Sequence, residues 1–462
     1  MKISYLGASD INGSLLTIET PAASPGREET SLLGRAASPG REETSLLGRA
    51  ASYGERAMVY KDGEPTPYNA QVVSLTQNTA QLQVFEGTTG FSLTNVRTQL
   101  TGKPFQLGLS LDMLGRTFDG LGSPIDDLGP IVPDVMRDID TPAINPQQRD
   151  YPRGFVQTGI SGIDLLVSLV QGQKLPIFST EGLPHDELAL QIVRQASTED
   201  SYIVFAGIGL KFDTYQFFKQ SFEALGNNHR LVTFLNLALS PVAERLQVPK
   251  VALTTAEYLA FDHGKDVIVI MTDMTAYCEA LRELSATRGE IPGRKGYPSY
   301  MYSQLSTIYE RAGVIKGRSG SVTLVPMLTM PAGDITHPIP DLTGFITEGQ
   351  IVLSKTVGVY PPISILPSLS RLMKDAIGTG KTVANHPPVA KAIFAHYAKT
   401  LQTRDLAQII GEEELSAMDK NYLAFGRAFE QTLLAQERSE NRTIAQTVSM
   451  ATQLLADHGL DM

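Results

Sequence analysis

The strongest indication of the fold lies at residues 175–188, which read LPIFSTEGLPHDEL. The apolar run at 175–178 predicts a buried strand, Gly182 lies in the turn that follows, and a helical pattern runs from 187 to 195. A nucleotide-binding α/β domain holds phosphate at such a junction, because the N–H groups and the dipole of a helix N-terminus converge there. The stretch therefore predicts an α/β domain with the shape of a nucleoside triphosphatase (NTPase) domain.

The residues that would bind phosphate are missing from this junction. Pro184, His185 and Asp186 stand where the Gly-Lys-Thr of a phosphate-binding loop (P-loop) belongs. No lysine can then reach the β- and γ-phosphates, and no hydroxyl follows to hold Mg²⁺. Acidic neighbours of His185 add negative charge where phosphate would lie. We interpret Gly182, Pro184 and His185 as a degenerate P-loop.

Two other motifs resemble parts of an ATP site. Residues 378–382 read GTGKT, but Asp375 stands where the P-loop motif needs its first glycine, and no strand leads into the segment. Residues 267–273 read VIVIMTD and resemble a Walker B strand, whose aspartate holds Mg²⁺. Because no P-loop lysine lies beside it, we favour a buried strand capped by Asp273, a degenerate Walker B position.

Further apolar runs lie outward from the junction, at residues 203–205, 231–235, 267–271, 322–325 and 351–353. Helical stretches such as 275–284 separate several of them. Continuous apolar strands that alternate with helices predict a parallel sheet buried on both faces. We therefore expect a central α/β domain over residues 101–370.

The two ends of the chain show other patterns. Residues 1–100 contain alternating apolar and polar positions, as at Ala80, Leu82 and Val84, which predicts a small antiparallel barrel or sandwich. Residues 371–462 read as a helical domain, because apolar residues in 412–434 recur at steps of three and four. These residues are Leu415, Met418, Tyr422, Phe425, Phe429 and Leu433.

A tandem repeat interrupts the N-terminal part. Residues 22–35 recur letter for letter as 36–49, and a third copy begins at 50 and diverges at Tyr53. Each unit is shorter than the roughly 20–50 residues of a solenoid repeat and has little apolar content. We interpret residues 22–52 as a solvated loop insertion.

Composition disfavours several classes of function. The 462 residues include 39 Lys and Arg against 49 Asp and Glu, a net charge of −10, and this disfavours a nucleic-acid partner because duplex binding depends on basic residues. The single cysteine, Cys278, excludes an intrachain disulfide and a cysteine-based zinc site, and we expect no metal site. The aliphatic run at 267–271 is far short of the ~20 apolar residues that span a bilayer. We expect a cytoplasmic chain with no direct membrane span.

Longer ordered strings extend over nearly the whole chain outside the repeat. They are YGER (53–56), VFEGT (84–88), DMLGR (112–116), FDGLG (118–122), QTGIS (157–161), MTDMT (271–275), PGRKGYP (292–298), HPIPDLTG (337–344) and ITEGQ (346–350). Together they resemble the B subunit of V-type and archaeal A-type rotary ATPases, the non-catalytic, regulatory partner in an alternating hexamer. The resemblance implies an N-terminal antiparallel β-barrel, a central RecA-like α/β domain and a C-terminal helical domain.

The resemblance also implies where the chemistry lies. In this family the catalytic nucleotide sites belong to the neighbouring A subunit, so no catalytic residue is expected in this chain itself. The string PSLSR at 367–371 resembles the segment that reaches across the interface, which makes Arg371 the candidate arginine finger, with Ser370 beside it. ATP or ADP with Mg²⁺ is then expected at the interface, held mainly by the partner subunit.

Other implied partners are the central shaft and the peripheral stalk, in a soluble head that is peripheral to the membrane and holds three copies each of A and B. Arg294, Lys295 and Tyr297 lie in a Gly- and Pro-rich loop that, by resemblance, faces the shaft. The acidic run Glu412, Glu413 and Glu414 is expected to start a helix that leans on the shaft. An acidic helix N-terminus favoured by the helix dipole explains the same run equally well.

Two other classes of protein share this architecture. A catalytic ATPase subunit of the F-type or secretion-type family requires a working P-loop, which residues 179–188 lack. A Rho-like RNA helicase requires a P-loop and RNA-binding basic or aromatic positions, and the net charge of −10 disfavours it. A third reading is an assembly-defective paralogue that carries the repeat.

Overall fold

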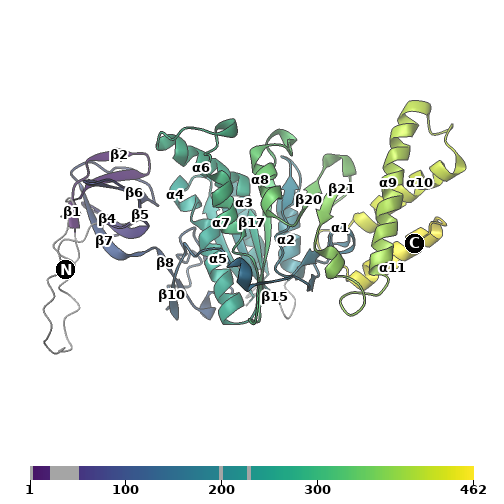
Figure 1. The fold of residues 1–462 in the computed structure, drawn as a ribbon, viewed down its shortest axis with the longest axis horizontal. Coiled ribbons are helices and arrows are strands. Elements are labelled where there is room, and N and C mark those ends of the chain that lie inside the picture. Colours follow the sequence, from purple (N-terminus) through teal and green to yellow (C-terminus); the bar gives the residue numbers. More distant parts are fainter. Residues whose placement is uncertain (1–3, 21–50, 197–200, 226–229, 462) are drawn as a thin grey trace.

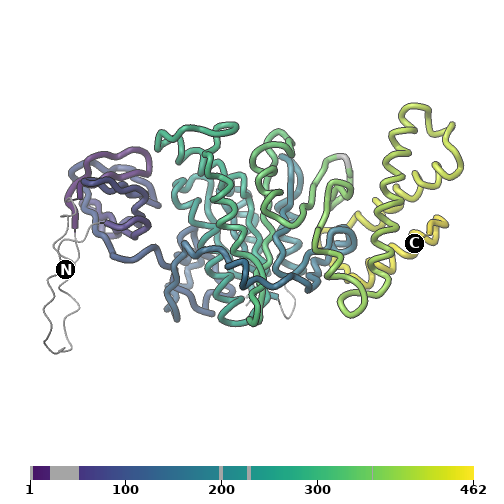
Figure 2. The backbone as a smooth tube through the Cα atoms, viewed as in Figure 1, coloured from purple at the N-terminus to yellow at the C-terminus, as the bar shows by residue number. Residues whose placement is uncertain are grey.

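The computed structural model describes residues 4–20, 51–196, 201–225 and 230–461. Three regions follow one another along the long axis of the molecule: an N-terminal sheet, a central α/β region and a C-terminal group of helices (Figures 1 and 2). The repeat at 22–49, and with it almost all of the predicted loop insertion at 22–52, lies outside the described residues. None of the helices in the described ranges is long and apolar enough to cross a membrane.

The N-terminal region is a seven-stranded antiparallel sheet with the order β1-β7-β4-β5-β6-β3-β2. Its strands are β1 (Ser4–Leu6), β2 (Asp10–Asn12), β3 (Leu15–Glu19), β4 (Glu55–Lys61), β5 (Tyr68–Leu75), β6 (Thr79–Val84) and β7 (Val96–Pro104). The antiparallel sheet agrees with the predicted pattern. No pair between the outer strands β1 and β2 occurs among the described residues, so closure into a barrel stays a prediction. The predicted domain boundary at residue 100 lies inside β7.

The central region is built on a ten-stranded, mostly parallel sheet with the order β21-β20-β14-β19-β17-β15-β16-β9, to which β18 and β11 are added. The six apolar runs predicted as strands lie in β14 (Ile177–Ser179), β15 (Ser201–Leu210), β16 (Leu231–Leu237), β17 (Asp266–Thr272), β19 (Ser321–Thr329) and β20 (Gly349–Leu353). All six run parallel, whereas β21 (Ile363–Ser370) is antiparallel to β20. The remaining strands are β9 (Thr117–Phe118), β11 (Arg149–Asp150) and β18 (Gly313–Ile315). Two short antiparallel pairs join β8 (Gln106–Leu109) to β10 (Val135–Asp138) and β12 (Phe155–Val156) to β13 (Leu169–Val170).

Helices bury both faces of this sheet. In β17, Val267 and Val269 belong to one hydrophobic core, together with residues of α5, α6 and α7, whereas Ile268 and Ile270 belong to a second core, together with residues of α2, α3 and α9. Alternate side chains of a strand point to opposite faces, so a strand covered on both sides must be apolar throughout. The helices of this region are α1 (Ser161–Leu166), α2 (His185–Ala196), α3 (Phe212–Ala224), α4 (Val242–Arg245), α5 (Val248–Glu257), α6 (Met274–Thr287), α7 (Met301–Tyr309) and α8 (Pro338–Ile346).

The C-terminal region consists of α9 (His386–Ile410), α10 (Ala417–Ala428), the π-helical segment η8 (Phe429–Leu434) and α11 (Ile444–Asp457). The expectation that the acidic run 412–414 starts a helix is wrong. Helix α9 ends at Ile410 and is followed by Gly411, whose φ is +89°. Helix α10 begins only at Ala417, because the Ser416 hydroxyl caps it by accepting a hydrogen bond from Asp419 N (3.1 Å). Met418, predicted on the apolar face, is exposed in the first turn of α10.

Candidate functional site

The degenerate P-loop lies at the carboxyl edge of the central sheet, between β14 and α2. His185 opens α2, and its Nδ1 lies 3.1 Å from Leu183 O and 3.3 Å from Ser179 Oγ. Gly182 adopts a φ of +82°, a turn conformation that glycine allows. The loop is therefore held by bonds within the chain, and Pro184 adds no side-chain donor for a phosphate oxygen.

Asp273 lies at the same edge, directly after β17. Its Oδ1 accepts hydrogen bonds from Thr275 N (2.7 Å) and from Thr329 N (3.2 Å). The first bond caps α6, and the second ties the end of β17 to the end of β19. The structure thus brings Asp273 and the degenerate P-loop to one edge, where Asp273 acts as a helix cap.

The electrostatics of this edge oppose phosphate binding. Burial raises the pKa of Asp186, the neighbouring carboxylates of Asp273 and Glu187 raise it further, and His185 lowers it. One cation that the sequence motifs did not indicate is Lys355, whose Nζ would lie 3.6 Å from a Cβ placed on Gly182. Lys355 follows β20 rather than the loop, so its position depends on the order of strands in the sheet.

Arg371 and Ser370 lie at the opposite edge of the sheet. Because β21 is antiparallel to β20, its last residue, Ser370, pairs with Gly349, the first residue of β20. Arg371 N donates to Glu348 O (2.9 Å), and Ser370 Oγ accepts from Gln173 Nε2 (2.9 Å). The Arg371 side chain is exposed, and within the described residues its guanidinium has no hydrogen bond or ion pair.

A buried lysine fixes the backbone beneath Arg371. Lys174 is only 3% exposed, and its Nζ lies 2.6 Å from Glu348 Oε1 and 3.5 Å from Glu310 Oε1. Lys174 N also donates to Glu348 Oε2 (2.8 Å), and Gln173 Nε2 donates to Glu348 O (3.2 Å). Glu348 therefore holds the Arg371 backbone with its carbonyl and, with its carboxylate, holds Lys174 in the segment that leads into β14. No motif in the sequence indicated Gln173 and Lys174.

The loop predicted to face a shaft lies between α6 and α7 and has two different kinds of side chain. Arg294 and Lys295 are exposed and form ion pairs with Asp341 (3.1 Å) and Asp334 (3.1 Å). Tyr297 is buried, and its hydroxyl donates to Glu279. Burial, together with this carboxylate, raises the pKa of Tyr297.

The acidic run 412–414 lies in the connection between α9 and α10, in the C-terminal region (Figure 1). Its three side chains are exposed, and Glu412 pairs with Arg427 (2.7 Å). Within the described residues, no hydrogen bond or ion pair joins this run to Arg294 or Lys295. The structure therefore keeps the two predicted shaft-facing segments on different domains.

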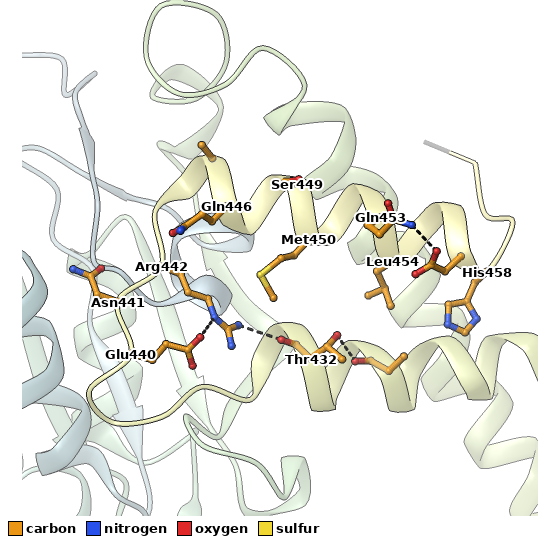
Figure 3. Close-up of a pocket in the computed structure, with 13 residues that line it drawn as sticks. Thr432, Glu440, Asn441, Arg442, Gln446, Ser449, Met450, Gln453, Leu454 and His458 are labelled. Carbon is orange, nitrogen blue, oxygen red and sulfur yellow. Dashed lines mark hydrogen bonds and ion pairs between the residues drawn. The ribbon is translucent and has the colours of Figure 1, made fainter.

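A groove of about 1020 Å³ lies between η8 and α11 in the C-terminal region (Figure 3). Met450 and Leu454 form part of its apolar wall, and the arginine that lines it, Arg442, is paired with Glu440 (2.6 Å). In the described part of the chain, no group of three or more His, Cys, Asp or Glu residues could hold a metal ion. The groove therefore offers no free cation for phosphate.

Comparisons with known proteins agree with this layout. Residues 159–370 match the nucleotide-binding domain of the ATP synthase alpha/beta family, and residues 375–460 match the C-terminal domain of V and A type ATP synthase. The V-type ATP synthase beta chain of Halothermothrix orenii is 53% identical over 84% of this chain and 85% of that protein. The V-type ATP synthase beta chain of Thermotoga neapolitana is 54% identical over 86% of this chain and 88% of that protein.

A solved structure, that of the ATP synthase subunit NeqB from Nanoarcheaum equitans, has a TM-score of 0.74 and 39% sequence identity, and covers 88% of this chain and 100% of its own. These matches confirm the resemblance indicated by the sequence strings. The chain belongs to the family of V-type ATP synthase beta chains, the B subunits of V- and A-type rotary ATPases.

Proposed function

We propose that this chain is the non-catalytic, regulatory subunit of its rotary ATPase, and that Arg371 completes the ATP site of an adjacent catalytic A subunit. The observation that carries the proposal is a contrast at Arg371: its exposed guanidinium has no hydrogen bond or ion pair within the described residues, whereas its backbone N–H is bonded to Glu348 O and the neighbouring Ser370 hydroxyl is bonded to Gln173. A guanidinium with this freedom can reach a group on another chain, while its attachment point stays fixed.

The position of Arg371 supports a role in trans. In a closed ring, each chain meets its two neighbours through two different surfaces. The degenerate P-loop lies at the carboxyl edge of the sheet and Arg371 at the opposite edge, so the two face different surroundings. A single chain could thus present its own loop to one neighbour and its arginine to the other.

The chemistry of arginine suits this role. A planar guanidinium donates paired hydrogen bonds to phosphate oxygens and stays charged when water is removed. An arginine finger stabilises the charge that develops in phosphoryl transfer and contributes roughly 10³–10⁵ in rate in small GTPases. In this chain Ser370 acts on the arginine indirectly, because its hydroxyl is bonded to Gln173.

Nucleotide binding in the proposed complex depends mainly on the partner subunit. The chain carries the family's nucleotide-binding domain, but its carboxyl edge has an acidic surround at Asp186 and a capped Asp273, which do not fit Mg²⁺–ATP held by this chain alone. ATP or ADP with Mg²⁺ would be held by the A subunit, with Arg371 as the contribution of this chain.

The remaining assembly follows the same proposal. Three copies of this chain would alternate with three A subunits, as part of a soluble head that is peripheral to the membrane. The exposed pairs at Arg294 and Lys295 and the exposed run 412–414 would face the central shaft and couple ATP turnover to ion transport. The peripheral stalk would hold the head against rotation.

ATP hydrolysis by the purified chain, alone and after assembly with its catalytic partner, tests the proposal. The chain alone should not hydrolyse ATP, whereas the assembled mixture should. Arg371→Ala should assemble normally and lower hydrolysis by roughly 10³-fold, the low end of the effect of a finger. Lys374→Ala is the matched control, since it removes an exposed cation three residues away and should leave the rate unchanged. Steady turnover by the chain alone, or full activity with Arg371→Ala, would overturn the proposal.

A further inference from the structure

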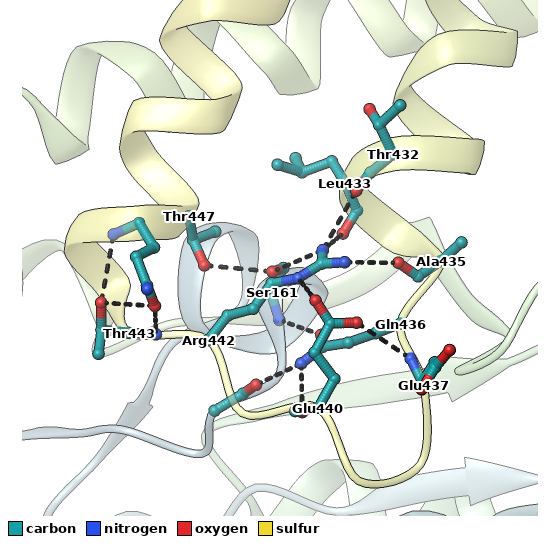
Figure 4. Close-up of polar contacts among 12 residues, drawn as sticks. Ser161, Thr432, Leu433, Ala435, Gln436, Glu437, Glu440, Arg442, Thr443 and Thr447 are labelled. Atoms are coloured by element: carbon teal, nitrogen blue, oxygen red, sulfur yellow. Dashed lines mark hydrogen bonds and ion pairs between the residues drawn. The ribbon is translucent and has the colours of Figure 1, made fainter.

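One loop of the C-terminal region, residues 436–442, is bonded to the start of α1 (Figure 4). Gln436 Nε2 donates to Gly159 O (2.6 Å), and Gln436 Oε1 accepts from Ser161 N (3.0 Å). Arg442 N also donates to Gly159 O (3.1 Å). The amide of Gln436 thus pairs with the backbone of the central region from both its atoms. Residues 436–442 are called the joint loop below.

The joint loop is also bonded to α2, the helix that begins at the carboxyl edge of the sheet. Gln191 Nε2 donates to Glu437 O (3.3 Å) and Glu440 O (3.2 Å), and Gln195 Nε2 donates to Glu440 O (2.6 Å). Both glutamines are buried, so water competes little for these bonds. The C-terminal region is therefore tied to two helices of the central region by one short loop.

Arg442 closes the joint loop. Its Nη1 donates to Leu433 O (3.0 Å), Thr432 O (3.2 Å) and Ser161 Oγ (3.3 Å) (Figures 3 and 4). Its Nη2 donates to Ala435 O (3.0 Å), and its Nε pairs with Glu440 (2.6 Å). One guanidinium thus satisfies the free carbonyls at the end of η8, fixes the loop through Glu440 and contacts α1. Only arginine has enough donors in a rigid plane to do this.

The central region holds its side of the contact equally firmly. The fully buried Asp164 accepts from Thr158 N (2.9 Å), Thr158 Oγ1 (2.7 Å) and Gly159 N (2.9 Å). A Cβ on Gly159 would overlap Asn441 Oδ1, so the two segments approach as closely as a glycine permits. The contact is therefore fixed from both domains and leaves little room for sliding.

We infer that the joint loop is the rigid link that makes the C-terminal helices move together with α1 and α2, and that Arg442 is its positioning residue. The inference rests on the proposed function, in which the C-terminal helices transmit force to or from a central shaft. With a rigid link, a movement of the C-terminal helices at the shaft also moves the central sheet. With a loosened link, the helices can move without the sheet. A substitution that removes the hydrogen bonds of Arg442 should then uncouple ion transport from ATP hydrolysis without altering the ATP site.

The test uses the complete complex in sealed vesicles, with ATP hydrolysis and ATP-driven ion uptake measured on the same sample. Arg442→Gln should retain most of the hydrolysis rate while the number of ions taken up per ATP falls by about threefold or more, the range seen when coupling networks are perturbed. Arg442→Lys keeps the charge but not the planar fork of donors. Its number of ions taken up per ATP should lie between that of the native complex and that of Arg442→Gln. The matched control is Glu437→Gln in the same loop, since the Glu437 side chain is exposed, makes no hydrogen bond or ion pair with the described residues and should leave the ratio unchanged.

If Arg442→Gln does not assemble, Thr447→Val gives a milder perturbation, because it removes only the contact of Thr447 Oγ1 with Ser161 Oγ (3.1 Å). An unchanged ratio of ions to ATP in assembled complexes, or a parallel fall of uptake and hydrolysis, would overturn the inference. The proposed function is judged separately by the loss of hydrolysis with Arg371→Ala. The two fail together only if the complex with the native chain drives no ion uptake.

Discussion

The two edges of the central sheet carry polar residues that are used in opposite ways. At the carboxyl edge, the polar atoms of His185 and Asp273 are bonded to their own chain and hold a loop and a helix in place. At the other edge, the backbone of Arg371 is bonded, while its exposed guanidinium makes no hydrogen bond or ion pair with any residue that the structure describes. A group bonded within its chain is not available to a ligand, whereas a free guanidinium on a fixed backbone is. The proposed phosphate-binding group, Arg371, thus lies at the edge opposite to the strand–loop–helix junction.

The largest test of this contrast is Arg371→Lys. Lysine keeps the positive charge but offers a point charge in place of the planar fork, so the assembled complex should lose roughly 10²-fold in hydrolysis rate. The measurement is kcat of the complex at saturating ATP, with assembly checked by size-exclusion chromatography. A lysine variant with native kcat would show that charge alone suffices and that the geometry at this edge is unimportant.

The next test removes the support beneath the arginine. Glu348→Gln leaves the carbonyl that accepts from Arg371 N, but it removes the charge that pairs with the buried Lys174. We expect the free energy of unfolding to fall by about 1–3 kcal/mol, since the buried Lys174 then keeps only its longer ion pair with Glu310 (3.5 Å). Urea unfolding of the isolated chain measures this.

Glu412→Gln provides the control for that experiment, because the same substitution there breaks an exposed pair with Arg427. Such a pair contributes below about 1 kcal/mol. Equal losses for the two variants would mean that the buried Lys174 does not depend on Glu348 and that the Arg371 backbone is not held by this network.

The third test addresses the carboxyl edge. Asp273→Asn keeps an oxygen that can accept from Thr275 N and Thr329 N, so stability should change by under about 1 kcal/mol, whereas Asp273→Ala removes the cap and should cost about 1–2 kcal/mol. Hydrolysis by the assembled complex should stay within about threefold of native for Asn, because the aspartate is not asked to hold Mg²⁺. Ser416→Ala, at the cap of α10, is a control for losing a cap elsewhere. Loss of hydrolysis with Asp273→Asn would give this edge a chemical role and break the contrast.

The sequence predicts the fold best where a residue pattern has a single structural explanation. Runs such as 267–271 and 322–325 are apolar throughout because both faces of their strands are covered, and this predicted the parallel sheet. The prediction that the acidic run 412–414 starts a helix is wrong, because the stop and start signals that α9 and α10 use are at Gly411 and Ser416. Acidic residues favour a helix N-terminus from outside it as well as from within its first turn, so the run could not fix the boundary.

The support of Arg371 could not be predicted from the sequence. Lys174 and Glu348 are 174 positions apart and meet only because β14 and β20 are neighbours in the sheet. Alternating strands and helices predict a parallel sheet but leave the order of its strands open. The position of Lys355 near the degenerate P-loop depends on the same neighbour relation. The sequence motifs therefore identified the degenerate P-loop and Arg371. The contacts that distinguish their two surroundings depend on the order of the strands, which the motifs do not give.

The smallest expected effect concerns Asp186 at the carboxyl edge. Burial raises the pKa of Asp186, and the carboxylates of Asp273 and Glu187 raise it further, against the effect of His185. Because this pKa lies higher in the folded than in the unfolded chain, the ionised carboxyl destabilises the native state at neutral pH. The penalty shrinks as pH falls through the folded pKa and vanishes below the unfolded one. Asp186→Asn should thus raise the free energy of unfolding at neutral pH, by under about 1 kcal/mol, and leave it unchanged in acid.

Urea midpoints at neutral and acidic pH measure this difference. Asp213→Asn is the control, since it changes an exposed aspartate in the first turn of α3 and should shift neither midpoint. If Asp186→Asn instead destabilises the chain at neutral pH, the carboxylate stabilises the α2 N-terminus through the helix dipole. The carboxylate of Asp186 would then stabilise the folded chain. The poor fit of this edge for phosphate would in that case follow only from the missing P-loop lysine.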